Sequence, residues 1–194
     1  MVYEAYPRAR GGLAAVGKGH VIRERYEATA KGYDELYRAE QYEKYSVALR
    51  RVPPRGRVLD AGCGTGLLAE YMRLTGYLDR VDLYVCMDYS WNMLEIARWR
   101  LSHICPGRCV AVEGNVLEIP FGDESFDAVY SFTVLDLVDS VRRAVGELRR
   151  VSRGPVVVSL LKSLPHKDLL LLEGYPLLGT TSKDALFRLD PPRA

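Results

Sequence analysis

The stretch Val58-Leu59-Asp60-Ala61-Gly62-Cys63-Gly64-Thr65-Gly66 decides the fold class. Its first four residues form a short, mainly apolar run that predicts a buried strand, and the glycines that follow predict a turn. Residues 67–74 then have the apolar spacing of a helix. A strand, a glycine-rich turn and a helix, in this order, form the first unit of a parallel sheet covered by helices.

The rest of the central chain repeats this alternation. Further strands are predicted at residues 83–87, 109–112, 126–132 and 155–161, with helices around 93–101 and 140–151. Short strands that alternate with helices predict an α/β fold with a doubly wound, mainly parallel sheet and helices on both faces. Crossover connections in such sheets are right-handed, which leaves few possible topologies.

A single domain is expected over residues 21–194, after a flexible arm at 1–20. Within it, tyrosines at helical spacing predict an N-terminal helix over 21–52, which ends at Pro53-Pro54. The core is expected at 56–161. The short C-terminal part, 162–194, is predicted to contain a helix near 165–173 and a strand near 185–189.

Composition bounds the setting of the protein. No run approaches the ~20 apolar residues of a membrane helix, so no membrane association is expected. The first 19 residues lack the apolar segment of a secretory signal, which favours the cytoplasm. The only amide side chains are Gln41, Asn92 and Asn115, a scarcity that hints at a thermophile. The net charge of +2 is too small to indicate nucleic-acid binding by itself.

The four cysteines are expected to be reduced, structural thiols. Cys63 lies in the glycine turn, Cys86 in an apolar run, and Cys105 and Cys109 flank three residues. This spacing does not resemble a disulfide framework, and a single CxxxC pair is a poor zinc site. No metal is therefore expected.

The spacing of the glycines separates the ligand classes that use such a turn. The dinucleotide fingerprint G-x-G-x-x-G would place its third glycine at position 67, which is Leu67. A P-loop also fails, because no Gly-Lys-Ser/Thr follows. The turn is instead G-x-G-x-G, with Asp60 two residues before its first glycine.

This pattern resembles the first motif of class I methyltransferases that depend on S-adenosylmethionine (SAM), and the resemblance extends to about residue 160. It implies a Rossmann-like fold, SAM as cofactor and methyl transfer as the reaction. In that family the acidic residue and the glycine-rich backbone bind the zwitterionic methionyl end of SAM. The positions that inherit this role are Asp60, Ala61, Gly62, Cys63, Gly64 and Gly66.

The resemblance also implies contacts for the adenosine part of SAM. Asp88, which ends the second predicted strand, would accept hydrogen bonds from the ribose hydroxyls. The alternative, which can hold at the same time, is that Ser90 or Asp88 is the N-cap of the helix that follows. Tyr89 and Met93 would line the adenine pocket. Asn115 stands where relatives commonly have Asp and can accept from the adenine amino group, next to Val116; a simple turn role for Asn115 remains an alternative.

The end of the fourth strand would face the transferred methyl group, with Ser131 and Phe132, while Tyr33 on the N-terminal helix would cover the site. The chain lacks the Asn/Asp-Pro-Pro motif of adenine or glutamine methylases and has no cysteine after residue 109 for cytosine C5 chemistry. The pattern is closer to enzymes of the ubiquinone-biosynthesis type. No catalytic residue is assigned, because positioning alone can supply most of the rate. Asp136, His166 and the N-terminal tyrosines could deprotonate or orient an acceptor, and a surface or packed-core role is the alternative for each.

The methyl acceptor is not identified by the sequence, and a small molecule is slightly favoured. A tRNA or rRNA methyltransferase that needs a partner subunit is an alternative, as is a SAM-binding protein without turnover. A phosphate-binding surface is one interpretation of the arginines on the helix near 140–151, and a solvated charged face is the other. A monomer or a homodimer is expected.

Overall fold

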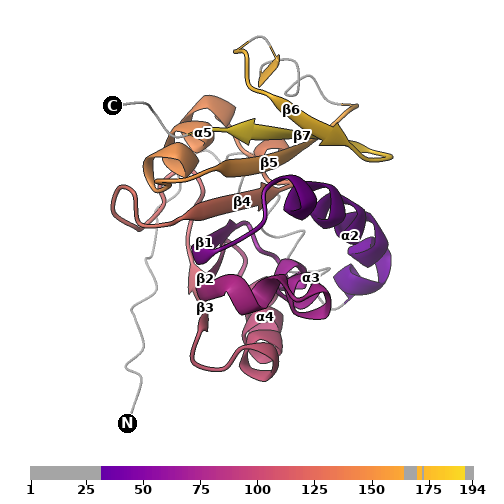
Figure 1. Cartoon of the computed structure of the whole chain (residues 1–194), viewed down its shortest axis with the longest axis vertical. Coiled ribbons are helices and arrows are strands. Elements are labelled where there is room, and N and C mark those ends of the chain that lie inside the picture. Colours follow the sequence, from indigo (N-terminus) through magenta and orange to yellow (C-terminus); the bar gives the residue numbers. More distant parts are fainter. Residues whose placement is uncertain (1–31, 164–169, 172, 191–194) are drawn as a thin grey trace, which may run out of the picture.

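The computed structural model describes residues 32–163, 170–171 and 173–190. Seven strands form one sheet in the order β3-β2-β1-β4-β5-β7-β6, in which β1 to β5 run parallel and β7 runs antiparallel to both neighbours (Figure 1). The predicted fold class is confirmed. The strands are β1 Gly56–Ala61, β2 Val81–Asp88, β3 Cys109–Glu113, β4 Ala128–Phe132, β5 Val156–Leu161, β6 Leu177–Thr180 and β7 Asp184–Leu189.

Helices cover both faces of the sheet. The first face carries α2 (Tyr33–Arg51), α3 (Leu67–Thr75) and α4 (Trp91–Ile104), and the second carries α5 (Val141–Arg150). Two hydrophobic clusters fill the two interfaces, one under α2, α3 and α4 and the other under α5. Because side chains alternate along a strand, Val58 and Tyr84 belong to the first cluster while Leu59 and Val85 belong to the second.

Local sequence sets where the helices start. The side chains of Ser90 and Ser140 accept hydrogen bonds from backbone N–H groups in the first turns of α4 and α5. Helix α3 follows a left-handed Gly66 and ends at a left-handed Gly76. The shape of the glycine turn therefore fixes the direction in which α3 leaves β1.

The C-terminal part contains more regular structure than the sequence indicates. The predicted strand at 185–189 is β7, but its partner β6 was not predicted. Strand β6 has only four residues, includes Gly179, and has an irregular register between Leu177 and Gly179. The expected arm at 1–20, the start of the N-terminal helix before residue 32, and residues 165–169 lie outside the described residues.

The expectation of reduced thiols is wrong. Disulfides join Cys63 to Cys86 and Cys105 to Cys109, with Cα–Cα distances of 5.3 and 5.6 Å. The first pair arises from sheet register: Asp60 lies opposite Cys86, so the turn that follows β1 passes beside β2. The second pair closes the short turn between α4 and β3. Sequence spacing indicates neither pairing, because both depend on how the chain folds back.

No described helix combines the length and apolar character needed to span a bilayer. Among the described residues, no group of three or more His, Cys, Asp or Glu side chains is arranged to hold a metal ion.

Candidate active site

The glycine turn lies at the carboxyl edge of the parallel strands, where ligands bind in doubly wound sheets. The N–H groups of Gly62 and Cys63 both donate to the carbonyl oxygen of Met87, at 2.7 and 3.0 Å, which fastens the turn to β2. Gly62 and Gly64 have φ angles of 81° and 55°, which favour glycine. A Cβ on Gly64 would meet no atom within 4 Å, so open space lies beside this part of the backbone.

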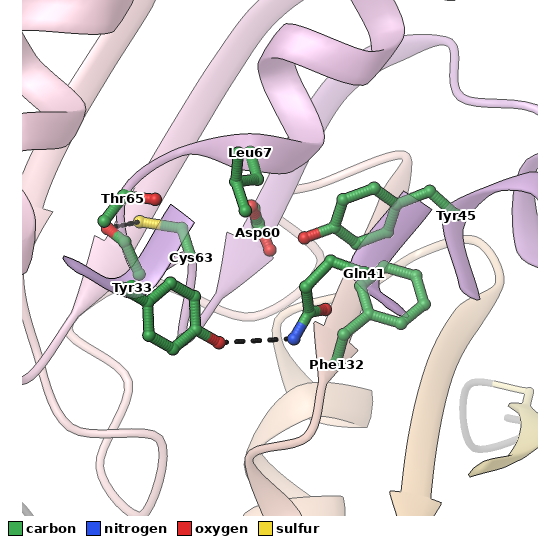
Figure 2. A pocket seen from close by; sticks show the side chains of 10 residues that line it. Tyr33, Gln41, Tyr45, Asp60, Cys63, Thr65, Leu67 and Phe132 are labelled. Atoms are coloured by element: carbon green, nitrogen blue, oxygen red, sulfur yellow. Dashed lines mark hydrogen bonds between the residues drawn. The ribbon is translucent and has the colours of Figure 1, made fainter. Parts of the chain in front are cut away.

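A small cavity opens between this turn, α2 and the end of β4 (Figure 2). Its lining combines backbone of the turn, three aromatic rings and a few polar groups. Among the described residues that line the cavity, Asp60 is the only one with a charged side chain. The lining consists of Tyr33, Gln41, Tyr45, Asp60, Gly62, Cys63, Gly64, Thr65, Leu67 and Phe132.

Asp60 is a carboxyl group in a largely dry environment. Its side chain is 3% exposed, and its Oδ2 accepts a hydrogen bond of 2.5 Å from the hydroxyl of Tyr84. Burial raises the pKa of Asp60 to about 7; the Tyr84 hydrogen bond opposes that rise, and the nearby charge of Asp88 adds to it. A cation placed in the cavity would favour the ionised form of Asp60.

Helix α2 supplies the opposite wall of the cavity. The Gln41 side-chain amide donates to the hydroxyl of Tyr33 at 3.2 Å, while Gln41 Oε1 is buried without a hydrogen-bond partner among the described residues. The hydroxyl of Tyr45 points towards Asp60 (Figure 2), and burial raises the pKa of Tyr45. Gln41 and Tyr45 were missed from sequence. Gln41 lies eight residues after Tyr33 and Tyr45 four residues after Gln41. These spacings put all three residues on one helix face and were the available indication.

An ionic network holds α2 over the turn. Asp34 accepts a hydrogen bond of 2.6 Å from the Thr65 hydroxyl and forms an ion pair with Arg100 of α4. Arg100 also donates to the carbonyl oxygen of Thr65 and lies 2.9 Å from Glu70 of α3. Arg100 is 7% exposed, so these contacts are largely shielded from solvent. Tyr33 therefore lines the cavity, while the next residue, Asp34, attaches α2 to the turn.

Asp88 binds the turn from the end of β2. Its Oδ2 accepts from the N–H of Gly64 and its Oδ1 from the N–H of Ser90, both at 2.8 Å. Asp88 therefore sits beside the start of α4, while Ser90 supplies the N-cap itself. A carboxylate oxygen can accept more than one hydrogen bond.

Comparisons with known proteins agree with this geometry. Residues 59–157 match the family model described as a methyltransferase domain. The chain belongs to this family. Its members are class I SAM-dependent methyltransferases, and the predicted family is thereby confirmed.

Individual relatives and solved structures give the same family. The chain is 32% identical over 165 residues to a demethylmenaquinone methyltransferase from Roseiflexus sp. (strain RS-1), a match that covers 81% of the chain and 66% of that protein. A SAM-dependent methyltransferase from Aquifex aeolicus superposes with a TM-score of 0.68 at 15% identity, over 84% of the chain and 96% of that structure. Magnesium protoporphyrin IX methyltransferase from Synechocystis PCC 6803, with bound SAM, superposes with a TM-score of 0.67 at 16% identity. This match covers 91% of the chain and 98% of that structure. The chain spans just under two thirds of the length of the first two curated relatives, 66% and 65%.

The cavity fits the methionyl end of the cofactor that this methyltransferase family uses. That end carries an ammonium group and, in SAM, a sulfonium. A single carboxylate among aromatic rings suits such cations, because rings attract cations at their faces. The unsatisfied Gln41 Oε1 offers an additional acceptor, and the open space at Gly64 admits a ligand to the backbone. The lining residues therefore fit SAM.

The other predicted site residues lie outside the cavity lining, where they support the turn or its surroundings. Ser131 is fully buried and donates to the carbonyl oxygen of Ala61 at 2.8 Å. Gly66 begins α3 and packs on Ala97. Met93 and Val116 are buried, at 1% and 7% exposure, whereas Tyr89 is 41% exposed.

Asn115 makes the turn contact that was the alternative interpretation. Its side-chain Oδ1 accepts from the N–H of Leu117 at 2.9 Å. A turn contact of this kind holds the loop after β3 and leaves the side-chain amino group for other contacts. The adenine role of Asn115 stays a prediction.

Beyond β4 lies a buried polar cluster that sequence did not indicate. Lys44 of α2 is fully buried; its Nζ donates to the Thr133 hydroxyl at 2.7 Å and lies 3.2 Å from Asp184. Thr133 has a φ of 60°, unusual for a β-branched residue, and such backbone is often found near functional sites. Burial raises the pKa of Asp184 although Lys44 opposes it. The cluster fixes the chain where β4 ends.

Among the candidate general bases, Asp136 is not one of the residues that line the cavity, whereas the tyrosines Tyr33 and Tyr45 of α2 are. Asp136 is 3% exposed, and its Oδ2 accepts from the N–H of Leu161 at 2.8 Å. His166 lies outside the described residues. No catalytic base is assigned to the described part of the chain.

Proposed function

We propose that this protein transfers the methyl group of SAM to a small-molecule acceptor. The observation that carries the proposal is the cavity in which Asp60, the open backbone at Gly64 and the aromatic wall of α2 converge. SAM supplies a methyl carbon that its sulfonium already activates. The protein's residues then need only to bind, orient and exclude water.

Each part of the site has a role in this proposal. Asp60 and the turn bind the methionyl end, and Asp88 accepts from the ribose hydroxyls. Residues around Asn115 and Val116 meet the adenine, while Ser131 and Phe132 face the side of methyl transfer. Thr133 and Lys44, just beyond, form the floor of the acceptor region.

The small-molecule acceptor is supported by the relatives' names. Several matched proteins are demethylmenaquinone methyltransferases, and others are malonyl-[acyl-carrier protein] O-methyltransferases. The arginines of the α5 region weaken the case for a phosphate-binding surface, because each has an acidic or carbonyl partner within the chain. These contacts are Arg142–Glu173, Arg143–Glu118, Arg149–Asp190, Arg150–Glu147 and Arg153–Asp127.

RNA methylation with a partner subunit is the second candidate. One relative is named a probable tRNA methyltransferase 9B from Homo sapiens, and one structural neighbour, from Haloferax volcanii, is a methyltransferase in complex with the activator Trm112. Two exposed apolar side chains near the β3 edge favour such a partner: Val110 is 43% exposed and Trp99, on α4, is 66% exposed. Binding without methyl transfer is a third candidate, since another neighbour is a [4+2]-cyclase.

We also propose that the protein works in the cytoplasm of a thermophile. Disulfides are rare in the cytosol of mesophiles but frequent inside hyperthermophiles, and the scarcity of amide side chains points the same way. An unfolding midpoint above about 90 °C would support this setting, and one in the mesophilic range of about 45–65 °C would count against it.

The first test is calorimetric titration with SAM and with its demethylated product, S-adenosylhomocysteine. We expect both to bind. Tritiated SAM is then supplied with a metabolite extract and, separately, with total RNA. Radioactivity in a small-molecule fraction supports the proposed acceptor class, and radioactivity in RNA would replace it with the second candidate. If folded protein binds neither ligand, the proposed function is wrong.

A further inference from the structure

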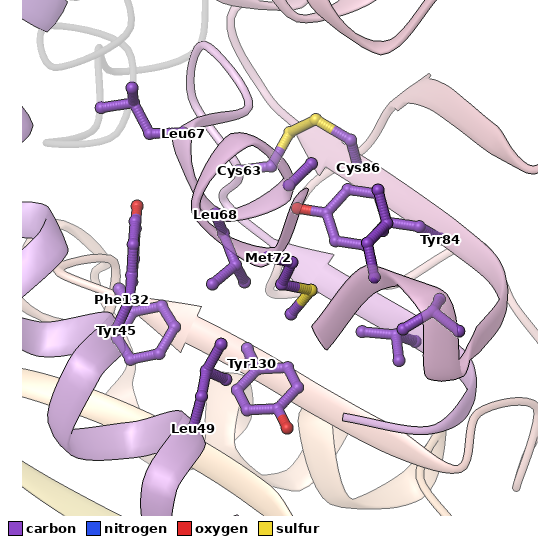
Figure 3. Packing of buried hydrophobic residues seen from close by; sticks show 14 of the residues in the cluster. Tyr45, Leu49, Cys63, Leu67, Leu68, Met72, Tyr84, Cys86, Tyr130 and Phe132 are labelled. Atoms are coloured by element: carbon purple, nitrogen blue, oxygen red, sulfur yellow. A yellow bond between two sulfur atoms is a disulfide. The ribbon is translucent and has the colours of Figure 1, made fainter. Parts of the chain in front are cut away.

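Tyr84 does not line the cavity, yet it contacts Asp60, the only charged side chain among the described lining residues. It is fully buried on β2, opposite Val58 of β1. Asp60 is two residues further along β1 and therefore faces the same side of the sheet. The Tyr84 ring packs in the cluster beside the Cys63–Cys86 disulfide (Figure 3), and its hydroxyl donates to Asp60 Oδ2 at 2.5 Å.

The surroundings of Asp60 otherwise oppose a negative charge. Asp88, at the end of β2, adds a like charge; α2 contributes the neutral hydroxyls of Tyr33 and Tyr45. The turn contributes Thr65 and Cys63, which cannot titrate in its disulfide. No lysine or arginine stands among the described lining residues, and the Tyr84 hydroxyl is the only side-chain hydroxyl within the described structure that donates to Asp60.

We infer that Tyr84 is a positioning residue for the cofactor: its hydroxyl holds the Asp60 carboxylate ionised and oriented to accept the ammonium group of SAM. This inference rests on the proposed function. Because Oδ2 is occupied by Tyr84, Oδ1 is the oxygen that remains for the ligand. A hydrogen bond to the charged form of an acid also favours that form.

The consequence is a defined pH dependence of SAM binding. Asp60 is neutral below about pH 7 and ionised above it, since burial raises its pKa to about 7. Affinity for the ammonium group therefore rises with pH up to that value. Removal of the Tyr84 hydroxyl takes a hydrogen bond from the ionised form, so it raises the pKa further and moves this rise to higher pH.

The test compares wild type and Tyr84→Phe by calorimetric titration with SAM between about pH 6 and about pH 9. The ratio of the two affinities is the readout, because the titration of SAM's own amino group, near pH 7.7–8.0 for a typical α-amine, affects both proteins equally and cancels. At the acidic end the variant should bind about tenfold more weakly for each unit by which the pKa rises. At the alkaline end the ratio should approach one.

Two controls separate positioning from general structural damage. Tyr130→Phe removes an equally buried hydroxyl from the same hydrophobic cluster, one that donates to the carbonyl oxygen of Val52 at 2.7 Å, and should leave the pH profile unchanged. Methylthioadenosine shares the adenosine and sulfur of SAM but lacks the ammonium group. Its affinity should be the same for wild type and Tyr84→Phe at every pH.

Each other outcome has a distinct meaning. An affinity ratio that is constant with pH, or an equal loss for methylthioadenosine, would overturn the inference and leave Tyr84 as a packing residue. If wild type binds neither ligand, the proposed function fails first. Should Tyr84→Phe not fold, fluorotyrosine in place of Tyr84 gives a stronger donor of nearly the same shape. It should move the profile to lower pH, and an unmoved profile refutes the positioning role.

Discussion

Alanine substitutions at Gly62 and Gly64 should differ in their main effect, although the two positions are only two residues apart. Gly62→Ala should mainly lower stability, and Gly64→Ala should mainly lower affinity for SAM. A Cβ on Gly62 would lie 2.1 Å from Val134 Cγ2, so the Val134 side chain or the turn must move. A Cβ on Gly64 would meet nothing within 4 Å. Both residues have positive φ, so both substitutions carry a backbone cost.

The magnitudes follow from these contacts. Left-handed backbone costs an alanine roughly 1–2 kcal/mol, and overpacking adds roughly 1–3 kcal/mol at position 62 only. Gly62→Ala should therefore lower the free energy of unfolding by about 2–5 kcal/mol and Gly64→Ala by about 1–2 kcal/mol. For a chain of this size these values correspond to falls in melting temperature of roughly 4–20 °C and roughly 2–8 °C.

Gly64→Ala, the less destabilised of the two variants, should nevertheless lose affinity for SAM. The new methyl group at position 64 would occupy the open space through which we propose that SAM approaches the backbone. Gly64→Ala should therefore bind SAM at least about tenfold more weakly, a loss of about 1.4 kcal/mol. Differential scanning calorimetry gives the melting temperatures and titration gives the affinities. Wild-type affinity in Gly64→Ala would refute the placement of the cofactor against this turn. A Gly62→Ala variant as stable as Gly64→Ala would refute the steric argument.

Three further predictions concern charged groups. Asp88→Ala should weaken SAM binding by about 1.5–3 kcal/mol through lost hydrogen bonds to a charged group, with the exposed Asp82→Ala on the same strand as control; unchanged affinity in a folded variant excludes the ribose role. Lys44→Met should destabilise the fold by about 3–5 kcal/mol in urea denaturation, because Asp184 loses its buried partner. The double variant with Asp184→Leu should recover part of the lost stability, and no recovery would contradict the pairing. The folded-state pKa of Asp60, about 7, lies above its unfolded value of about 3.9, so ligand-free protein should lose stability as pH rises between these values. Thermal melts across this range give the slope of melting temperature against pH. If Asp60→Asn shows the same slope as wild type, another group causes it.

The sequence predicted the features that depend on neighbours along the chain. The strand, the glycine turn and the helix from Val58 onward are local. The spacing of the glycines already excluded the dinucleotide fingerprint, and the lack of a following Gly-Lys-Ser/Thr excluded a P-loop. The strand alternation then gave the parallel sheet. The strand at 185–189 was predicted because its apolar residues are also neighbours along the chain. The four-residue β6 is too short for a recognisable apolar pattern, and it contains Gly179.

Features that depend on docking between distant segments were not predicted. Gln41 and Tyr45 reach the cavity because α2 is fastened to the turn by Asp34 and Arg100, contacts that join residues 66 positions apart. Lys44 pairs with Asp184 across 140 positions of the chain, and the thiol of Cys63 meets Cys86 only because β1 and β2 are adjacent in register. Such partners can be inferred only once the topology is known.

The Cys63–Cys86 bond closes a ring that contains the end of the glycine turn, α3 and most of β2. All of α3 lies between the two cysteines, together with the exposed Arg73 and Arg80. Trypsin cleavage at either arginine would break the chain without separating its pieces, so the nicked protein would migrate as one band until a reductant is added. The glycine turn would stay tethered to the end of β2 after the cut. Permuted or split versions of the protein could therefore be opened inside this ring, because the disulfide would keep the glycine turn and β2 covalently linked.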